Sequence, residues 1–138
     1  MRRVLFDSDV LIDVLAQRQP FFLASIQALN IVKRSQVQGY VSGHAVTNIF
    51  YILRRQIGSQ VARELLSRLL QGIQVASITD EVIRFALESL ITDFEDAVTS
   101  EAANAAGIEV IVTRNKADFV NSLVPAILPE EFVATFLE

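Results

Sequence analysis

The sequence predicts an α/β fold, a three-layer α/β/α sandwich around a central, mainly parallel sheet of four to five strands. Short apolar runs alternate with longer segments of helical periodicity along the 138 residues. Strands that are separated by helices pair in parallel, and the helices then cover both faces of the sheet. With 51% hydrophobic and 20% charged residues, the chain fits one domain, residues 1–138, with a substantial core.

The expected strands are short apolar or β-branched runs bounded by turn-forming residues. RVLF is bounded by Asp7, and EVIVT, near the end of the chain, is rich in β-branched residues. In chain order the expected strands are residues 3–6, 39–42, 73–78 and 109–113, with a brief strand before Pro129.

The expected helices carry apolar residues three or four positions apart and begin or end at known signals. Pro20 opens the second helix and Gly58 ends the third. Ser59 is expected to cap the fourth helix, and Thr79 precedes two acids in the first turn of the fifth. The expected helices are residues 10–16, 20–36, 44–57, 60–71, 80–91 and 93–107, with a final helix after Pro129.

Composition and charge exclude several kinds of site. The net charge of -4 argues against a purely electrostatic binder of nucleic acid, but an enzyme can reach phosphates through metal ions. Cysteine is absent and His44 is the single histidine, which excludes disulfides, cysteine nucleophiles and multi-histidine metal sites. Carboxylates remain, and they suit hard cations such as Mg²⁺ or Mn²⁺. No apolar run approaches a membrane span, so we expect a cytoplasmic protein without a membrane partner.

Asp7 and Asp9 directly follow the first strand, at the edge of the sheet where ligands bind in open α/β folds. A single acid there is explained as a helix cap. Two acids at i and i+2 repel each other, which favours a nearby cation or hydrogen-bond donor. Ser42 and Thr113 end other strands, so we expect them at the same edge. We expect Asp13 on the exposed face of its helix or as a support of the site.

Two later stretches carry further polar groups. Asp93 and Asp96 open the helix at residues 93–107 with the spacing of a capping box, and both roles can hold together, with Asp93 as the cap and Asp96 in the cleft. The stretch VTRNKADF is either a polar turn or part of a metal and phosphate site. Its polar residues are Thr113, Arg114, Asn115, Lys116 and Asp118.

The stretch VSGHAVTN opens the helix at residues 44–57. His44 is interpreted as a capping or surface residue rather than a general base, since no acid near it in sequence orients its ring. Further along the same helix, FYILRR combines core aromatics with Arg54 and Arg55, which form a solvated face or a partner surface.

The ordered set VLFDSDVLID, YVSGHAVTNIFYIL, DFEDAV and IVTRNKADF resembles the PIN domain family, small metal-dependent ribonuclease domains that include the VapC-type toxins of toxin-antitoxin pairs. The resemblance implies an acidic pocket that binds Mg²⁺ or Mn²⁺ and hydrolyses RNA phosphodiester bonds. It also implies a cognate antitoxin and a homodimer. The usual helix glutamate of the family falls on Asn48, which removes one negative charge from the pocket.

By position, the resemblance assigns roles to ten residues. The implied metal ligands are Asp7, Asp96 and Asp118, with Asp9 or Asp93 in support. The implied groups that orient water or the ligands are Asn48, Thr113 and Asn115. The residues implied to steady the RNA backbone are Arg114 and Lys116.

Two other functions stay open. One is a catalytically weak or inactive PIN-like module that binds RNA or protein, with Asn48 as the sign of lost activity. The other is a phosphatase, because FDSDVL resembles the Asp-x-Asp motif of haloacid-dehalogenase-like enzymes, in which the first Asp is a nucleophile. That class also needs a downstream Lys and a paired-acid motif, which VTRNKADF fits poorly.

Overall fold

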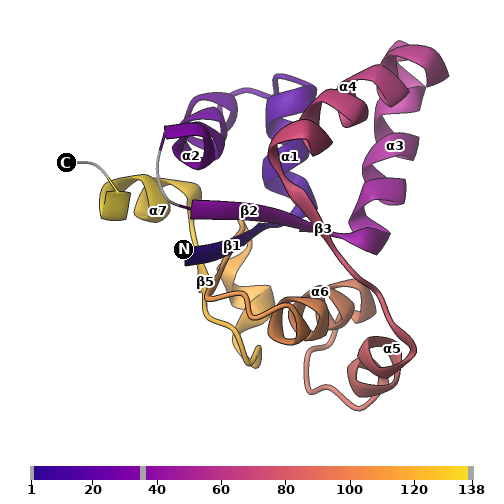
Figure 1. Cartoon of the computed structure of the whole chain (residues 1–138), viewed down its shortest axis with the longest axis vertical. Coiled ribbons are helices and arrows are strands. Elements are labelled where there is room, and N and C mark those ends of the chain that lie inside the picture. Colours follow the sequence, from indigo (N-terminus) through magenta and orange to yellow (C-terminus); the bar gives the residue numbers. More distant parts are fainter. Residues whose placement is uncertain (1, 35–36, 137–138) are drawn as a thin grey trace.

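A computed structural model describes residues 2–34 and 37–136 (Figure 1). Five strands form one sheet in the order β3-β2-β1-β4-β5, and every neighbouring pair is parallel. The strands are β1 (Arg2–Phe6), β2 (Val37–Ser42), β3 (Gln74–Ala76), β4 (Val110–Val112) and β5 (Ala126–Ile127). The predicted α/β/α architecture with a parallel sheet is therefore confirmed.

Helices cover both faces of the sheet, as Figure 1 shows, with α5 and α6 on one face and most of the remaining helices on the other. None of the helices within the described residues is long and apolar enough to cross a membrane. The helices are α1 (Ser8–Leu15), α2 (Phe22–Arg34), α3 (Gly43–Ile57), α4 (Ser59–Gly72), α5 (Asp80–Leu87), α6 (Phe94–Ala105) and α7 (Pro129–Phe136), with a 3₁₀ turn, η1 (Lys116–Phe119).

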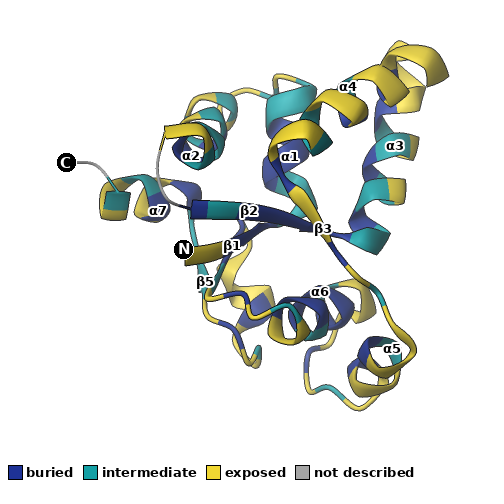
Figure 2. Ribbon diagram, in the orientation of Figure 1, coloured by how far each residue is buried: buried dark blue, intermediate teal, exposed yellow. Residues whose placement is uncertain are grey.

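The sheet separates two apolar cores. In β1, Val4 and Phe6 belong to the core beneath α1 to α4 and α7, while Leu5 belongs to the core beneath α5 and α6. In β4, Val112 belongs to the same core as Val4 and Phe6, and Ile111 belongs to the same core as Leu5. Successive side chains of a strand point to opposite faces, so a strand covered on both sides is apolar throughout. Figure 2 shows the buried residues on the helix sides that face the sheet.

Several predicted boundaries shift. Gly58, with φ +83°, both ends α3 and precedes α4, and α4 has no side-chain cap, so the expected capping role of Ser59 is wrong. The fifth helix ends at Leu87 instead of residue 91. Directly after Leu87, the Glu88 N–H donates to the Phe85 carbonyl in a tighter turn. The expected ends of two helices, at residues 35–36 and 137–138, lie outside the described residues.

The strand register brings distant parts of the chain to one edge of the sheet. Phe6 pairs with Val112, and the Asp7 N–H donates to the Val112 carbonyl at 2.9 Å, so β1 and β4 end at the same level. Leu5 pairs with Tyr40, which places the end of β2 beside them. The loops after these three strands therefore start side by side, as the sequence predicted.

Candidate functional site

Asp7 lies between β1 and α1 and has hydrogen bonds on both carboxylate oxygens. Its Oδ1 accepts from the Ser8 N–H at 2.9 Å, which makes it the cap of α1. Its Oδ2 accepts from the Thr113 hydroxyl, also at 2.9 Å, from the end of β4. Asp7 thus combines the capping role with a place at the centre of the carboxyl edge.

Asp9 joins the start of α1 to the loop after β4. Its Oδ2 accepts from the Arg114 N–H at 3.1 Å and from the Asn115 side-chain amide at 3.0 Å. Its Oδ1 accepts from the Val10 N–H at 2.7 Å. The protein itself therefore supplies the donors that two neighbouring acids require.

Arg114 and Asp13 form an ion pair behind this loop. The guanidinium Nε lies 2.7 Å from Oδ2 of Asp13 and Nη2 lies 3.2 Å from Oδ1, while the Asp13 side chain is fully buried. Ser25 donates its hydroxyl to the same Oδ2 at 3.1 Å. The expected exposed position of Asp13 is wrong, and it supports the site from the next turn of α1 instead.

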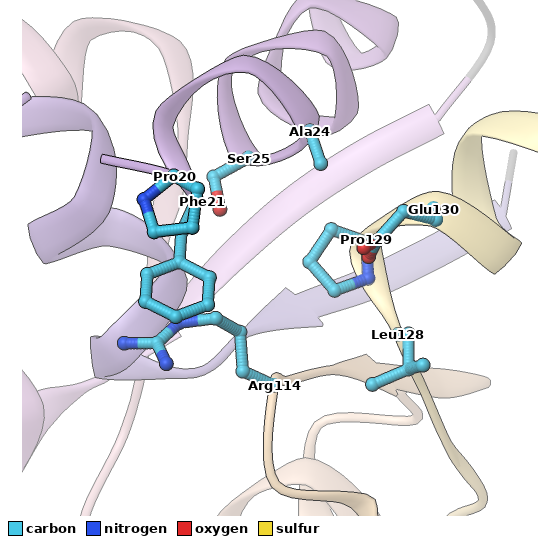
Figure 3. A pocket seen from close by; sticks show the side chains of 8 residues that line it. All are labelled: Pro20, Phe21, Ala24, Ser25, Arg114, Leu128, Pro129 and Glu130. Carbon is cyan, nitrogen blue, oxygen red and sulfur yellow. The ribbon is translucent and has the colours of Figure 1, made fainter. Parts of the chain in front are cut away.

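The Phe21 ring covers the Arg114 guanidinium, whose central carbon lies 3.8 Å from the ring centroid. Figure 3 shows this pair on one wall of a cavity of about 330 Å³, across from Pro129 and Glu130. The sequence analysis expected Arg114 to face a phosphate, but in the structure its guanidinium faces Asp13. Its backbone N–H is the part that reaches the acidic cluster.

Asp96 and Asp118 approach from other elements. Asp96 lies in the first turn of α6, where its N–H donates to the Asp93 carboxylate at 3.1 Å, so the predicted cap at Asp93 is confirmed. Asp118 is exposed on η1. Within residues 2–34 and 37–136, neither the Asp96 nor the Asp118 carboxylate accepts a hydrogen bond. Their oxygens are open to other ligands.

The acids act on one another electrostatically. Burial, followed by the charge of Asp9, raises the pKa of Asp7 from 3.8 to about 7, and Asp96 contributes to this rise. Burial also raises the pKa of Asp96 to about 6, followed by the charges of Asp93 and Asp118. Burial raises the pKa of Asp9 as well. These acids therefore form one electrostatically linked group, called the acidic cluster below, which consists of Asp7, Asp9, Asp96 and Asp118.

The acidic cluster has no ready-made coordination geometry. Across the part of the chain that the structure describes, no three side chains of Asp, Glu or His are arranged to hold a metal ion. After burial, the charge of Asp96 contributes to the raised pKa of Asp7, and the charge of Asp118 contributes to that of Asp96, so the three acids lie within electrostatic range. Their role as metal ligands stays a prediction.

The remaining candidates lie around this cluster. Asn48 is half-buried on the second turn of α3 and has no hydrogen bond to a described side chain. The Lys116 ammonium binds the exposed Glu131 carboxylate at 3.0 Å. The His44 Nε2 lies 3.1 Å from the Glu95 carbonyl on α6, and its Nδ1 is buried with no partner among the described atoms. His44 thus joins α3 to α6, a contact that no local sequence signal reveals.

Comparisons with known proteins agree on one fold. The sequence profile of a family described as PIN domain matches residues 3–117. Similar solved structures include a toxin-antitoxin complex from Klebsiella pneumoniae, with 22% identity, 91% of this chain and 97% of that chain covered, and a TM-score of 0.69. VapBC2 from Rickettsia felis, bound to a promoter DNA fragment, has 11% identity, coverage of 91% and 98%, and a TM-score of 0.70.

A third similar structure is VapC20 from Mycobacterium tuberculosis, a sarcin-ricin loop cleaving toxin, with 16% identity, coverage of 78% and 86%, and a TM-score of 0.63. At these identities the likeness establishes the fold. No curated protein sequence gives a significant match.

Proposed function

The chain belongs to the PIN domain family, and from this premise we propose that it is a divalent-metal-dependent endoribonuclease, the toxin component of a toxin-antitoxin pair. The observation that carries the proposal is the acidic cluster at the carboxyl edge of the sheet. Its members come from three separate parts of the chain, and neighbouring acids add to burial in raising the pKa of Asp7 and the pKa of Asp96. A cluster of this kind in an open α/β fold is a strong candidate for the active site.

The chemistry of these side chains fits a hard divalent cation. All the available ligand atoms are carboxylate oxygens, the type that Mg²⁺ and Mn²⁺ prefer. Burial, followed by the charges of neighbouring acids, raises the pKa of Asp7 and the pKa of Asp96, and a bound cation relieves the repulsion between these acids. We assign the ion to Asp7, Asp96 and Asp118, with Asp9 and Asp93 in support. A divalent ion at such a site lowers the pKa of a bound water and neutralises charge on a phosphate.

The neighbouring polar residues hold the carboxylates in place. Thr113 fixes Oδ2 of Asp7, and Asn115 fixes Oδ2 of Asp9. In this proposal Thr113 and Asn115 keep the two carboxylates oriented toward the ion, while Asn48 holds a water or the RNA. Such neighbours commonly determine metal affinity as strongly as the ligands do.

Lys116 and Arg114 take different roles. Among the residues that the structure describes, Lys116 pairs only with the exposed Glu131. Exposed pairs of this kind contribute little in water, so Lys116 is able to bind an RNA phosphate. Arg114 is engaged by Asp13, and we assign it to the support of the site instead.

A protein inhibitor and a homodimer complete the proposal. Similar folds occur in toxin-antitoxin complexes, which supports a cognate antitoxin for this chain. The antitoxin is expected to block the acidic cluster with a basic side chain, because a cation there offsets the mutual repulsion of the acids.

The test is cleavage of total cellular RNA by the purified protein in Mg²⁺, Mn²⁺ or EDTA. Cleavage should require metal, disappear in Asp7→Asn, and persist in Asp80→Asn, the same substitution at an exposed acid of α5. Equal cleavage by wild type and Asp7→Asn marks a contaminating nuclease and contradicts the proposal. Metal-dependent release of phosphate from a generic phosphomonoester favours the phosphatase alternative.

A non-catalytic binding module is the second candidate function. Two observations favour it, namely Asn48 in place of a glutamate and the lack of three coordinating side chains in the described residues. If the wild type binds RNA but cleaves none of it in either metal, this second candidate replaces the first.

A further inference from the structure

The hairpin formed by α3 and α4 is a basic part of an acidic chain. Of the 16 Asp and Glu residues, only Glu64 lies between residues 43 and 72, whereas four of the 12 Lys and Arg residues lie there. These four are Arg54, Arg55, Arg63 and Arg68. The chain as a whole has a net charge of -4, whereas the hairpin carries more basic than acidic residues.

Two of these arginines stack on aromatic rings in a continuous row. The Arg54 guanidinium lies 4.9 Å from the Tyr51 ring centroid, and the Tyr51 and Phe50 rings meet edge to face at 5.2 Å. The Arg63 guanidinium, on α4, lies 5.7 Å from the Phe50 ring. We call Arg54, Tyr51, Phe50 and Arg63 the stacked row. Phe50 packs against the core, which fixes the row in place, while Tyr51 is 51% exposed.

The arginines of the stacked row have no carboxylate partner in the described parts of the chain, unlike Arg114 and Lys116. Their charge is therefore available to an outside anion. An exposed aromatic ring between guanidinium groups also offers a flat apolar face. Together these are the two elements that bind single-stranded nucleic acid, stacking for the bases and cations for the phosphates.

The hairpin begins beside the acidic cluster. Ser42 ends β2 next to the end of β1, and α3 starts at the following residue. Tyr51 lies about 12 Å further along the helix axis at the usual rise per residue. Figure 1 shows α3 extending from that edge of the sheet and α4 turning back from its far end, and Figure 2 shows that their outer surfaces are exposed. A strand that enters the cluster can thus follow α3.

We propose that the stacked row is a binding platform for single-stranded RNA, on which Tyr51 stacks with a base while Arg54 and Arg63 bind the backbone phosphates. The inference rests on the proposed ribonuclease function and adds the place where the substrate is held. It also explains how an acidic protein retains RNA, because the charge that binds the backbone is separated from the charge that binds metal.

The experiment measures binding of a fluorescein-labelled single-stranded RNA of mixed sequence by anisotropy, over a range of KCl concentrations. Every protein also carries Asp7→Asn, so the RNA is bound without being cut. Tyr51→Ala tests the stack, with Tyr51→Phe as the variant that keeps the ring. The double substitution Arg54→Gln and Arg63→Gln tests the charge. Lys33→Gln with Arg34→Gln, at the end of α2, is the control with equal loss of charge.

Tyr51→Ala is expected to weaken binding about tenfold, with Tyr51→Phe close to the parent, since stacking needs only the ring. The Arg54 and Arg63 double variant is expected to reduce the slope of log affinity against log salt by about 1.4, the value for two lost phosphate contacts on a single strand. The control pair should leave this slope almost unchanged.

The proposal is overturned if Tyr51→Ala binds as tightly as the parent or if the control pair loses as much affinity as the arginine pair. Absence of RNA binding by the parent protein, which carries Asp7→Asn alone, also overturns the proposal. The stacked row is then assigned to contact with a protein partner. Cleavage by the proteins with Asp7 intact is scored separately. If RNA binding depends on the stacked row but no RNA is cleaved, the proposed function alone is contradicted. If RNA is cleaved but its binding does not depend on Tyr51, this inference alone is contradicted.

Discussion

The Arg114 guanidinium and the Asp13 carboxylate meet with Nε 2.7 Å from Oδ2, and the Asp13 side chain is completely buried. Arg114 lies in the loop that follows β4, and Asp13 lies on α1, 101 positions earlier in the sequence. Their contact fixes the loop whose Arg114 N–H and Asn115 amide bind Asp9. The ion pair therefore links the stability of the core to the geometry of the acidic cluster.

Arg114→Ala should destabilise the protein strongly. The substitution leaves Asp13 buried without a counter-ion, and removal of one partner of a buried pair costs about 3 to 5 kcal/mol. The free energy of unfolding from urea denaturation measures the effect. Lys116→Ala is the control from the same loop, because its exposed pair with Glu131 contributes little to stability in water. Equal losses in the two variants contradict the structural role of Arg114.

Thr113→Val should weaken metal binding while the fold is retained. Valine has nearly the same shape, but it removes the hydroxyl that orients Oδ2 of Asp7. Loss of such a supporting hydrogen bond typically costs about 10-fold or more in metal affinity. Calorimetric titration with Mn²⁺ gives the affinity, and Thr135→Val, on the exposed face of α7, is the matched control. An unchanged affinity in Asp7→Asn and Asp96→Asn shows that the proposed ligand set is wrong.

The stability of the metal-free protein should fall as the pH rises. The pKa of Asp7 is about 7 in the folded protein against an ordinary value of 3.8, so the folded state holds its proton more tightly than the unfolded chain does. Between these two values the folded state binds more protons, and the free energy of unfolding decreases with increasing pH. Asp96, with a pKa of about 6, acts in the same direction.

Asp7→Asn should remove much of this pH dependence, since asparagine retains the cap of α1 without the charge. Urea denaturation in EDTA at a series of pH values measures the difference between the two proteins. The variant is expected to exceed the wild type in stability near neutral pH, by a margin that grows from about pH 4 to about pH 7. A wild type whose stability rises over this range contradicts the raised pKa values.

Asn48→Glu should strengthen metal binding. The substitution supplies the carboxylate that the resemblance to the PIN domain family implies at this position, and ligand charge is a main determinant of affinity for hard cations. Mn²⁺ titration and the rate of RNA cleavage should both increase. Gln56→Glu adds the same charge at the exposed far end of α3 and should change neither. If both variants bind Mn²⁺ like the wild type, Asn48 lies outside the metal site.

Gly39→Ala should destabilise the sheet, whereas Gly72→Ala should not. A Cβ at Gly39 would lie 2.9 Å from the Ile73 side chain and 3.0 Å from Val32, inside the core beneath α2. Overpacking of this kind costs about 1 to 3 kcal/mol. At Gly72, the last residue of α4, a Cβ meets nothing within 4 Å. Thermal unfolding of both variants distinguishes the two sites, and similar midpoints contradict the close packing at Gly39.

Periodicity and turn signals were sufficient to predict the fold. Each strand of the sheet overlaps a predicted apolar run, although β1 begins one residue and β2 two residues earlier than expected, and Thr79 and Asp93 cap α5 and α6 as their sequence context indicated. These signals are local, because a cap or an amphipathic stripe needs only neighbouring residues. The placement of Asp7 and Thr113 at one edge followed from the parallel topology alone.

The contacts between distant side chains were beyond such signals. His44 and Glu95 are 51 positions apart, and nothing near either residue identifies the other. The burial of Asp13 is a case of the same kind. Asp9 and Asp13 lie one turn apart on the same side of α1, which is the spacing of a solvated face. Arg114, which pairs with the buried Asp13, lies 101 positions away.

The order of the strands along the chain determines when the site becomes complete during synthesis. Asp7 and Asp9 follow β1, while Thr113, Arg114 and Asn115, which donate to them, come more than a hundred residues later. Chains are made from the amino terminus, so a nascent chain that stops before residue 113 carries the two acids without these three donors. The nascent protein therefore acquires this arrangement only after β4 has been made.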